Sequence, residues 1–263
     1  MNAHIPPVLE AQAIAVTFGG LKAVDGISFT LKAGEIVGLI GPNGAGKTTL
    51  FNALVGLQRL TSGQVLLGGD KVSGLKPHRV AGKGMTKTFQ NAALFPDMSV
   101  LENVLTAALL RHDLASARER AGAVLHRLGL GAIAQTDVAD LTFPQKALVE
   151  MARALATEPK VLLLDEVMAA LTPSEMDEVM AVIRSLRDEG LTFLVVEHHM
   201  RAIMALCDRL LVVNFGRLIA QGTPAEVAND PVVIEAYLGQ GAAHGAATGA
   251  ATGSTTVAGG AHA

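Results

Sequence analysis

Cysteine is almost absent from the sequence, in which Cys207 is the only one. A single thiol cannot form a disulfide within the chain, so we expect a reducing compartment, with Cys207 as a small buried side chain. Charged residues are also scarce, at 17%, and the formal net charge is -3. Because Lys and Arg do not gather into a stripe, the sequence argues against a nucleic-acid-binding protein.

Long apolar runs are missing as well. No stretch approaches the roughly 18 uninterrupted apolar residues that a membrane-spanning helix requires. The amino terminus, MNAHIPPVLE, has no basic segment followed by an apolar run, which argues against a secretory signal. We therefore expect a chain that does not span a membrane, although a protein partner can attach it to one.

The last part of the chain has no charged residue at all. From Gly239 to Ala263 the composition is dominated by Gly, Ala and Thr, and Val257 is the only larger aliphatic residue. Such a segment cannot bury enough apolar surface to offset the entropy lost on ordering. We expect residues 239–263 to form a disordered tail and residues 6–238 to form the folded domain.

Short apolar runs of strand length recur within residues 6–238, namely EIVGLI, VLLLD, TFLVVE and RLLVV. Runs of this kind are typical of a parallel sheet covered on both faces. Helical patterns lie between them, including PSEMDEVMAVIRSLRDEG, in which Thr172 and Glu175 have the spacing of a capping box. The alternation of strand and helix predicts an α/β fold, and the purely helical patterns of residues 92–158 predict an inserted helical subdomain.

The run EIVGLI leads directly into GPNGAGKTTL, which fits the pattern G-x-x-x-x-G-K-[ST]. The glycines let several backbone N–H groups face inward, and the helix that follows adds its positive end. Lys47 would neutralise the outer phosphates and Thr48 would offer its hydroxyl oxygen to Mg²⁺. A chance glycine-rich turn is the alternative. We predict a phosphate site formed by Gly41, Pro42, Asn43, Gly44, Ala45, Gly46, Lys47, Thr48 and Thr49.

Polar residues follow two of the other apolar runs. VLLLDE ends in Asp165, which can hold Mg²⁺ through a bound water, and Glu166, which can act as the base for an attacking water. TFLVVEHHM carries His198 and His199 directly after its apolar run. A histidine after a strand often makes structural hydrogen bonds only, but this strand belongs to the same predicted sheet, which favours a catalytic role. Gln90, in KTFQN, can orient water or touch the metal, but alone it indicates little. An ordinary surface carboxylate is the alternative for Glu166.

Taken in order, these segments resemble the nucleotide-binding subunit of ABC transporters over residues 8–238. The resemblance implies a P-loop NTPase core with a mostly parallel sheet, an antiparallel β subdomain and an inserted helical subdomain. It also implies the family's roles for several residues. These are the glutamine loop at Gln90, metal binding at Asp165, catalysis at Glu166, the switch histidine at His198 and adenine stacking on Phe18, for which a core phenylalanine is the alternative.

The match is closer to one branch, the ATPase subunits of bacterial importers for branched-chain amino acids and related small amides. It includes GLKAVDGISFTLKAGEIVGLIGPNGAGKTTLFNALVG and TFQNAALFPDMSVLENVL. This resemblance implies ATP and Mg²⁺ as cofactors and a head-to-tail dimer with a second, identical or different ATP-binding subunit. It further implies two membrane-embedded permease subunits, contacted near Gln90 and the helical insertion, and a peripheral location on the cytoplasmic side of the membrane.

The segment LTFPQ, residues 141–145, stands where this family usually has Leu-Ser-Gly-Gly-Gln. The resemblance implies that Thr142 and Gln145 contact ATP held by the other subunit. Pro144 replaces a glycine; proline is tolerated in a first helical turn, but it removes an N–H that could bind the γ-phosphate. Losing such a bond costs about 1.5 to 3 kcal/mol, so we expect hydrolysis to be impaired rather than abolished.

Other departures from the family pattern follow Glu166 and His198. Val167, Ala170 and Thr172 stand where proline, glycine and an acidic or amide residue are usual, and His199 replaces an aspartate. Two functions therefore remain open: an ATP-hydrolysing energy-coupling subunit of an importer, and a nucleotide-gated binding subunit that turns over little. A GTPase is disfavoured because the chain has no Asn-Lys-x-Asp segment.

Overall fold

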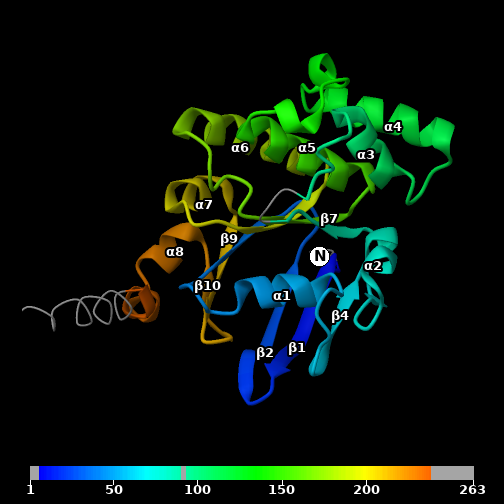
Figure 1. Ribbon diagram of the computed structural model, residues 1–263. Coiled ribbons are helices and arrows are strands. Elements are labelled where there is room, and N and C mark those ends of the chain that lie inside the picture. The colour runs from blue at the N-terminus through cyan, green and yellow to red at the C-terminus, as the bar shows by residue number, and fades with distance from the viewer. Residues whose placement is uncertain (1–5, 90–92, 238–263) are drawn as a thin grey trace, which may run out of the picture.

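The computed structural model describes residues 6–89 and 93–237, which form two β-sheets with helices between and above them (Figure 1). The larger sheet has six strands in the order β10-β9-β3-β8-β7-β6. Neighbouring strands in it are parallel except for β10, which runs antiparallel to β9. The strands are β3 (Ile36–Ile40), β6 (Met85–Lys87), β7 (Val161–Asp165), β8 (Thr192–Val196), β9 (Arg209–Asn214) and β10 (Arg217–Gly222).

The four apolar runs of the sequence are central strands of this sheet. Every residue of β3, β7 and β8 is buried, because helices or the second sheet cover both faces. The predicted mostly parallel sheet is confirmed. Since parallel strands end at the same edge, the residues that follow β3, β7 and β8 are brought together there.

The second sheet is antiparallel, with the strand order β2-β1-β4-β5. It consists of β1 (Leu9–Phe18), β2 (Leu21–Leu31), β4 (Ser62–Leu67) and β5 (Asp70–Lys71). On β2, Ile27, Phe29 and Leu31 are buried whereas Ser28 and Thr30 are exposed, which is the alternation of a half-buried strand. Helix α1 (Lys47–Leu54) packs between the two sheets through Leu50, Phe51 and Leu54.

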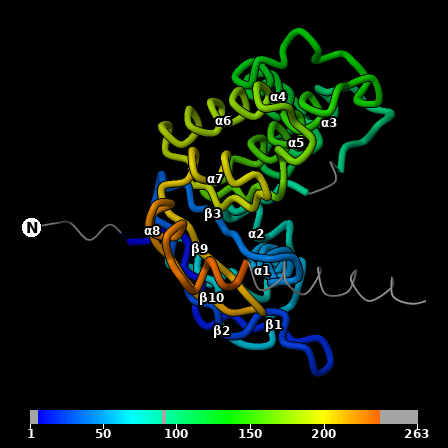
Figure 2. The backbone as a smooth tube through the Cα atoms, turned by 90° about the vertical axis from the view of Figure 1, so that its left-hand side faces the viewer, coloured from blue at the N-terminus to red at the C-terminus, as the bar shows by residue number. Residues whose placement is uncertain are grey.

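Most other helices cover the opposite face of the larger sheet (Figures 1 and 2). Between β6 and β7, the described residues 93–158 form helices and loops without a strand. The helices are α2 (Pro77–Lys83), α3 (Val100–Ala108), α4 (Leu114–Arg127), α5 (Phe143–Ala156), α6 (Pro173–Asp188), α7 (Met200–Leu206) and α8 (Pro224–Ala228). The domain boundaries given above remain predictions, because residue 92 and residues 238–263 lie outside the described residues.

Helix α6 shows how the local sequence sets the ends of an element. Thr172 is its N-cap and forms the predicted capping box with Glu175, which gives the N–H groups of these two residues their hydrogen-bond partners. The apolar stripe that packs on the core is buried throughout and comprises Met176, Val179, Met180, Ile183 and Leu186. Gly190 follows the helix with a positive φ of 97°, as a C-terminal glycine does.

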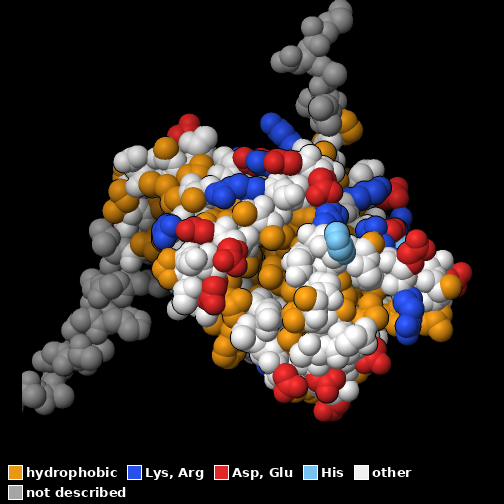
Figure 3. Space-filling model, turned by 90° about the horizontal axis from the view of Figure 1, so that it is seen from above, with side chains coloured by type: hydrophobic (Ala, Val, Ile, Leu, Met, Phe, Trp, Pro, Cys, Tyr) orange, Lys and Arg blue, Asp and Glu red, His pale blue; other side chains and the backbone are white. Residues whose placement is uncertain are grey.

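The structure also bears on the expectations about Cys207, membrane-spanning helices and surface charge. Cys207 is buried, and burial raises the pKa of its thiol to about 12, which makes it inert. None of the helices in residues 6–89 and 93–237 combines the length and apolarity needed to cross a bilayer. On the face seen in Figure 3, Lys and Arg side chains are interspersed with Asp and Glu and form no basic stripe.

Candidate functional site

The loop between β3 and α1 is packed too tightly for any residue but glycine at two positions. A Cβ atom at Gly41 would lie 2.0 Å from the carbonyl oxygen of Val213, and one at Gly46 would lie 2.2 Å from that of Ala23. Gly46 also has a φ of 102° and is the N-cap of α1. The glycines at these two positions therefore let the loop press against β2 and β9.

Lys47 begins α1 and folds back into this loop. Its Nζ donates to the carbonyl oxygens of Gly41 at 2.7 Å and Pro42 at 3.0 Å, and the residue is 7% exposed. Burial lowers the pKa of the ammonium, and the nearby carboxylates of Glu166 and Asp165 oppose that shift. A positive charge is thus held inside the loop, next to the two carboxylates that the sequence placed at the end of β7.

A cavity of about 650 Å³ opens at this loop. It is lined by ten of the predicted site residues, Phe18, Asn43, Gly44, Ala45, Gly46, Lys47, Thr48, Thr49, Glu166 and His198, and by Leu21, Lys22, Ala23, Phe215 and Gly216. Phe18 ends β1 and is 47% exposed, so it is not a core phenylalanine. The structure therefore brings predicted site residues from four separate segments to one cavity. Gln90 lies outside the described residues.

A second aromatic side chain lines the cavity, and sequence reasoning missed it. Phe215 lies in the turn between β9 and β10 and is 76% exposed. The turn is fixed to the loop, because the N–H of Gly216 donates to Ala45 O at 2.9 Å. A large aromatic residue in a hairpin turn, where it cannot be buried, was the signal available in NFG, residues 214–216. Phe18 and Phe215 give the cavity an aromatic entrance on which a base can stack.

Glu166 and His198 meet across two neighbouring strands. His198 Nε2 lies 2.6 Å from Glu166 Oε1. Glu166 has a φ of 54°, unusual for a residue with a side chain, and its N–H donates to Val196 O at 2.9 Å. Such a backbone conformation persists only where surrounding contacts impose it, and it is typical of functional sites. This pair can hold and move a proton at the edge of the cavity.

The second histidine makes a different contact. His199 is the N-cap of α7, and its Nε2 lies 3.5 Å from the carbonyl oxygen of Ala169. It therefore joins the end of β8 to the loop that follows Glu166. The sequence offered no interpretation of His199, and in the structure its side chain makes this polar link between the two segments.

Glu197, which precedes both histidines, is a buried carboxylate that sequence reasoning did not single out. Its Oε1 accepts a hydrogen bond from Met168 N–H at 2.8 Å, and the residue is 3% exposed. Burial raises its pKa from 4.5 to about 7, against the lowering effect of the Met168 N–H. A carboxylate at the end of a buried strand, directly before two polar residues, was the available signal.

Replacing Glu197 should stabilise the protein in a pH-dependent way. A carboxyl group whose pKa is raised by folding costs nothing below its unfolded pKa. Its penalty grows as the pH rises from the unfolded value of 4.5 to the folded pKa of about 7, and it is constant above that. Glu197→Gln should therefore raise the free energy of unfolding by about 3 kcal/mol at pH 8 and by less than about 1 kcal/mol at pH 5. Urea unfolding at both pH values measures this. Glu119→Gln, on the exposed face of α4, is the control, and equal effects of Glu197→Gln at both pH values would contradict the assignment.

The segment LTFPQ begins α5, away from the cavity. Thr142 is the N-cap, and its side chain forms a capping box with Gln145, whose Oε1 accepts from Thr142 N–H at 2.9 Å. Pro144 occupies the second helical position, as predicted for a first turn. Thr142 and Gln145 do not line the cavity within this chain, so their predicted contact with ATP would have to come from a second subunit.

The groups predicted to hold Mg²⁺ are oxygen donors of the kind this ion prefers. Thr48 lines the cavity, and Asp165 ends β7 behind it with 2% exposure. Among residues 6–89 and 93–237 no group of three or more His, Cys, Asp or Glu side chains could hold a metal ion by itself. Mg²⁺ usually takes one or two protein oxygen ligands together with phosphate oxygens and water, and the Thr48 hydroxyl and the Asp165 carboxylate are ligands of that kind. The residues present therefore fit the ion.

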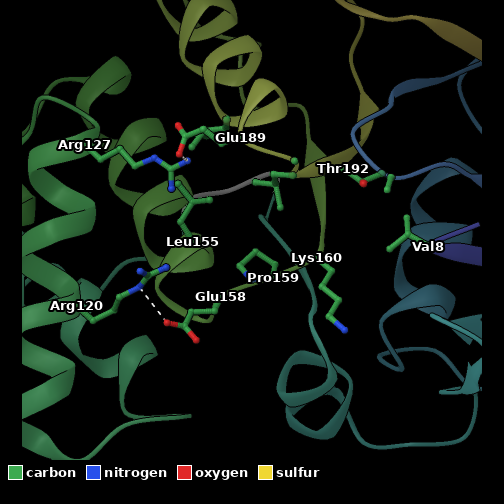
Figure 4. Close-up of a pocket in the computed structure, with 13 residues that line it drawn as sticks. Val8, Arg120, Arg127, Leu155, Glu158, Pro159, Lys160, Glu189 and Thr192 are labelled. Carbon is green, nitrogen blue, oxygen red and sulfur yellow. Dashed lines mark ion pairs between the residues drawn. The ribbon is translucent and has the colours of Figure 1, made fainter. Parts of the chain in front are cut away.

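Another cavity, of about 480 Å³, lies at the opposite end of the larger sheet, where β7 and β8 begin (Figure 4). Two ion pairs cross it, Arg120 with Glu158 at 3.4 Å and Arg127 with Glu189. Both arginines come from α4, whereas the glutamates follow α5 and α6. Because its arginines are already paired and it has no glycine loop, this cavity has no equivalent of the phosphate site.

A glycine loop between a buried parallel strand and a helix, with Asp165 and Glu166 at the end of a strand of the same sheet, defines a P-loop NTPase. The chain belongs to the ABC transporter family, whose model matches residues 24–169. A second model, described as branched-chain amino acid ATP-binding cassette transporter, matches residues 217–243. The protein is therefore an ABC-type ATPase.

Individual relatives agree with this assignment. The chain is 38% identical to the high-affinity branched-chain amino acid transport ATP-binding protein BraF of Pseudomonas aeruginosa, covering 89% of this chain and 98% of the relative. It is 37% identical to the lipopolysaccharide export system ATP-binding protein LptB of Haemophilus influenzae, with the same coverage. A solved ATP-binding cassette in its ADP conformation superposes with a TM-score of 0.82 at 30% identity, covering 89% of this chain and 99% of that one.

Proposed function

We propose that this chain is the ATP-hydrolysing, energy-coupling subunit of an importer for branched-chain amino acids or related small solutes. The observation that carries the proposal is the match of residues 217–243 to a model specific for branched-chain amino acid cassettes. The similarity to BraF supports it over the whole domain. The similar identity to LptB, an export protein by name, makes the transported solute the point that needs a direct test.

Transport in a defined membrane tests the solute. The chain would be reconstituted into liposomes with the permease subunits and binding protein of a branched-chain amino acid importer from the same organism, with ATP enclosed. We expect ATP-dependent uptake of labelled leucine, and none with Glu166→Gln. ATP hydrolysis without leucine uptake, in a complex that moves another class of solute, would contradict the proposed substrate and leave the ATPase assignment intact.

The proposed reaction follows from the cavity. Adenine would stack on Phe18, and the loop N–H groups with Lys47 would hold the phosphates. Glu166 would take a proton from the attacking water, with His198 at 2.6 Å fixing the orientation of its carboxylate. Mg²⁺, when bound, supplies charge neutralisation between the outer phosphates, and Thr48 and Asp165 would hold it, with Gln90 as a further ligand or water-orienting group.

The proposed partners are two transmembrane permease subunits and a second ATP-binding subunit, which place the chain at the cytoplasmic side of the membrane as a peripheral protein. Exposed apolar side chains on the helical insertion support a contact there. Leu109, Leu110 and Leu114 lie around the turn between α3 and α4, and Phe95 precedes α3. Side chains of this size are costly to leave in water, so a partner surface would cover them.

The start of α5 supports weakened hydrolysis. Pro144 has no N–H, and the Gln145 N–H faces the Thr142 hydroxyl in the capping box, at 3.5 Å. Among Phe143, Pro144 and Gln145, only Phe143 then has an N–H that is well placed to donate to a phosphate of ATP held by the other subunit. The alternative function, a nucleotide-gated subunit with little turnover whose partner carries the competent site, rests on the same observation.

The substitution Pro144→Gly distinguishes the two functions. It restores an N–H in the first turn of α5, and we expect the steady-state ATPase rate to rise about tenfold, as for one regained charge-assisted hydrogen bond. Pro173→Gly is the control, because it restores an N–H in the first turn of α6, a helix with no residue in the cavity lining. If Pro144→Gly leaves the rate unchanged, the nucleotide-gated binding role is favoured.

A further inference from the structure

Lys87 is a lysine in an unusual place, at the end of β6 with only 8% of its surface exposed. Lysines are almost never buried unless their charge is paired. Its Nζ donates to Asn52 Oδ1 at 3.0 Å and to Asp165 Oδ2 at 3.1 Å, and it lies 5.0 Å from the centre of the Phe89 ring. The ammonium therefore links the end of β6 to α1 and to the end of β7.

The two hydrogen-bond partners of Lys87 belong to the elements that carry the predicted Mg²⁺ ligands. Asn52 lies four residues after Thr48 on α1, so both side chains are on the same face of that helix. Asp165 ends β7, which pairs in parallel with β6 and places Lys87 opposite Leu163. Lys87 thus connects the helix of Thr48 to the carboxylate of Asp165.

The geometry leaves one oxygen of Asp165 for another task. Oδ2 accepts from Lys87, while the backbone N–H of Asp165 donates to Thr88 Oγ1 at 3.1 Å. A carboxylate held at one oxygen by a charged donor has a fixed plane, and its other oxygen then has a fixed direction. With Lys87 removed, the buried carboxylate would lose this restraint.

We propose that Lys87 is a positioning residue for the metal site, which sets the carboxylate of Asp165 against the helix of Thr48 so that both oxygen ligands meet Mg²⁺ at a fixed separation. This inference rests on the proposed function, because it takes Mg·ATP as the ligand of the cavity. Lys87 does not touch the nucleotide. It acts through Asp165 and Asn52, and its contribution should therefore be confined to the part of ATP binding that depends on Mg²⁺.

Calorimetry of ATP binding with and without Mg²⁺ tests the proposal without relying on activity. For the wild type, Mg²⁺ should tighten ATP binding. We expect Lys87→Met to lower the ratio of the ATP dissociation constants without and with Mg²⁺ by about tenfold. The dissociation constant measured without Mg²⁺, in EDTA, should change by less than about threefold. Lys83→Met is the matched control, because Lys83 pairs with Asp70 at 2.9 Å on the surface just before β6, and it should behave as the wild type.

Several outcomes would overturn the proposal. If Lys87→Met weakens ATP binding equally with and without Mg²⁺, or leaves both unchanged, Lys87 is only a structural residue. Should Lys87→Met not fold, Asn52→Ala decides, because it keeps the pair of Lys87 with Asp165 and should lower the Mg²⁺-dependent gain by about threefold. A wild type that binds no ATP in either condition would instead refute the proposed function.

Discussion

Glu166→Gln is expected to lower the steady-state rate of ATP hydrolysis by about 10² to 10⁴-fold, the usual contribution of a general base. The glutamine has nearly the same shape and can still lie beside His198, whose Nε2 is 2.6 Å from the Glu166 carboxylate. It cannot accept a proton from the attacking water. The affinity for ATP should stay within a few-fold of the wild type, because Glu166 lines the cavity without forming the phosphate loop.

The measurement is a phosphate-release assay together with binding of a fluorescent ATP analogue. Glu178→Gln on the exposed face of α6 makes the same chemical change outside the site and should leave the rate unchanged. Unaltered hydrolysis by Glu166→Gln would show that another group takes the proton. A loss of nucleotide binding as large as the loss of rate would show that Glu166 holds the ligand instead.

Lys47→Ala should weaken the binding of ATP by at least about a hundredfold. The Lys47 ammonium sits inside the loop, on the carbonyl oxygens of Gly41 and Pro42, so it would meet the phosphates with two or more charge-assisted hydrogen bonds. Each such bond contributes about 1.5 to 3 kcal/mol. Removing the ammonium also leaves the negative charge of the phosphates less compensated inside the cavity.

Titration calorimetry gives the dissociation constant of this variant. Lys22→Ala is its control, because Lys22 lines the same cavity but is an exposed residue paired with Asp25 at 3.1 Å. We expect less than about a threefold change for Lys22→Ala, in keeping with the small contribution of exposed ion pairs. Equal effects of both substitutions would mean that Lys47 acts only through the overall positive charge of the cavity.

Local features of this protein could be predicted from its sequence because they depend on neighbouring residues. The phosphate loop needs only the run from β3 into α1, and Gly46 takes its left-handed conformation where the motif places it. The capping box of α6 joins Thr172 to Glu175 across three residues. Residues at the ends of β7 and β8 come together because parallel strands share one edge, and Glu166 lies beside His198 there.

Features that depend on the order of strands could not be derived in the same way. The pair of Lys87 with Asp165 joins residues 78 positions apart and exists because β6 is the neighbour of β7. Phe215 reaches the cavity because β9 lies beside β3, an order that no local pattern encodes. Whether Thr142 contacts a nucleotide depends on a second chain, so the sequence of one chain predicts it only through resemblance.

A crystal structure of Glu166→Gln with Mg·ATP tests the central claim, that the loop at residues 41–49 holds the phosphates of ATP. We predict the triphosphate in the 650 Å³ cavity, with the Lys47 Nζ within about 3 Å of an outer phosphate oxygen. Density for the nucleotide elsewhere, for example between α4 and the starts of β7 and β8 in the cavity of Figure 4, with the loop left empty at saturating ATP, would contradict it.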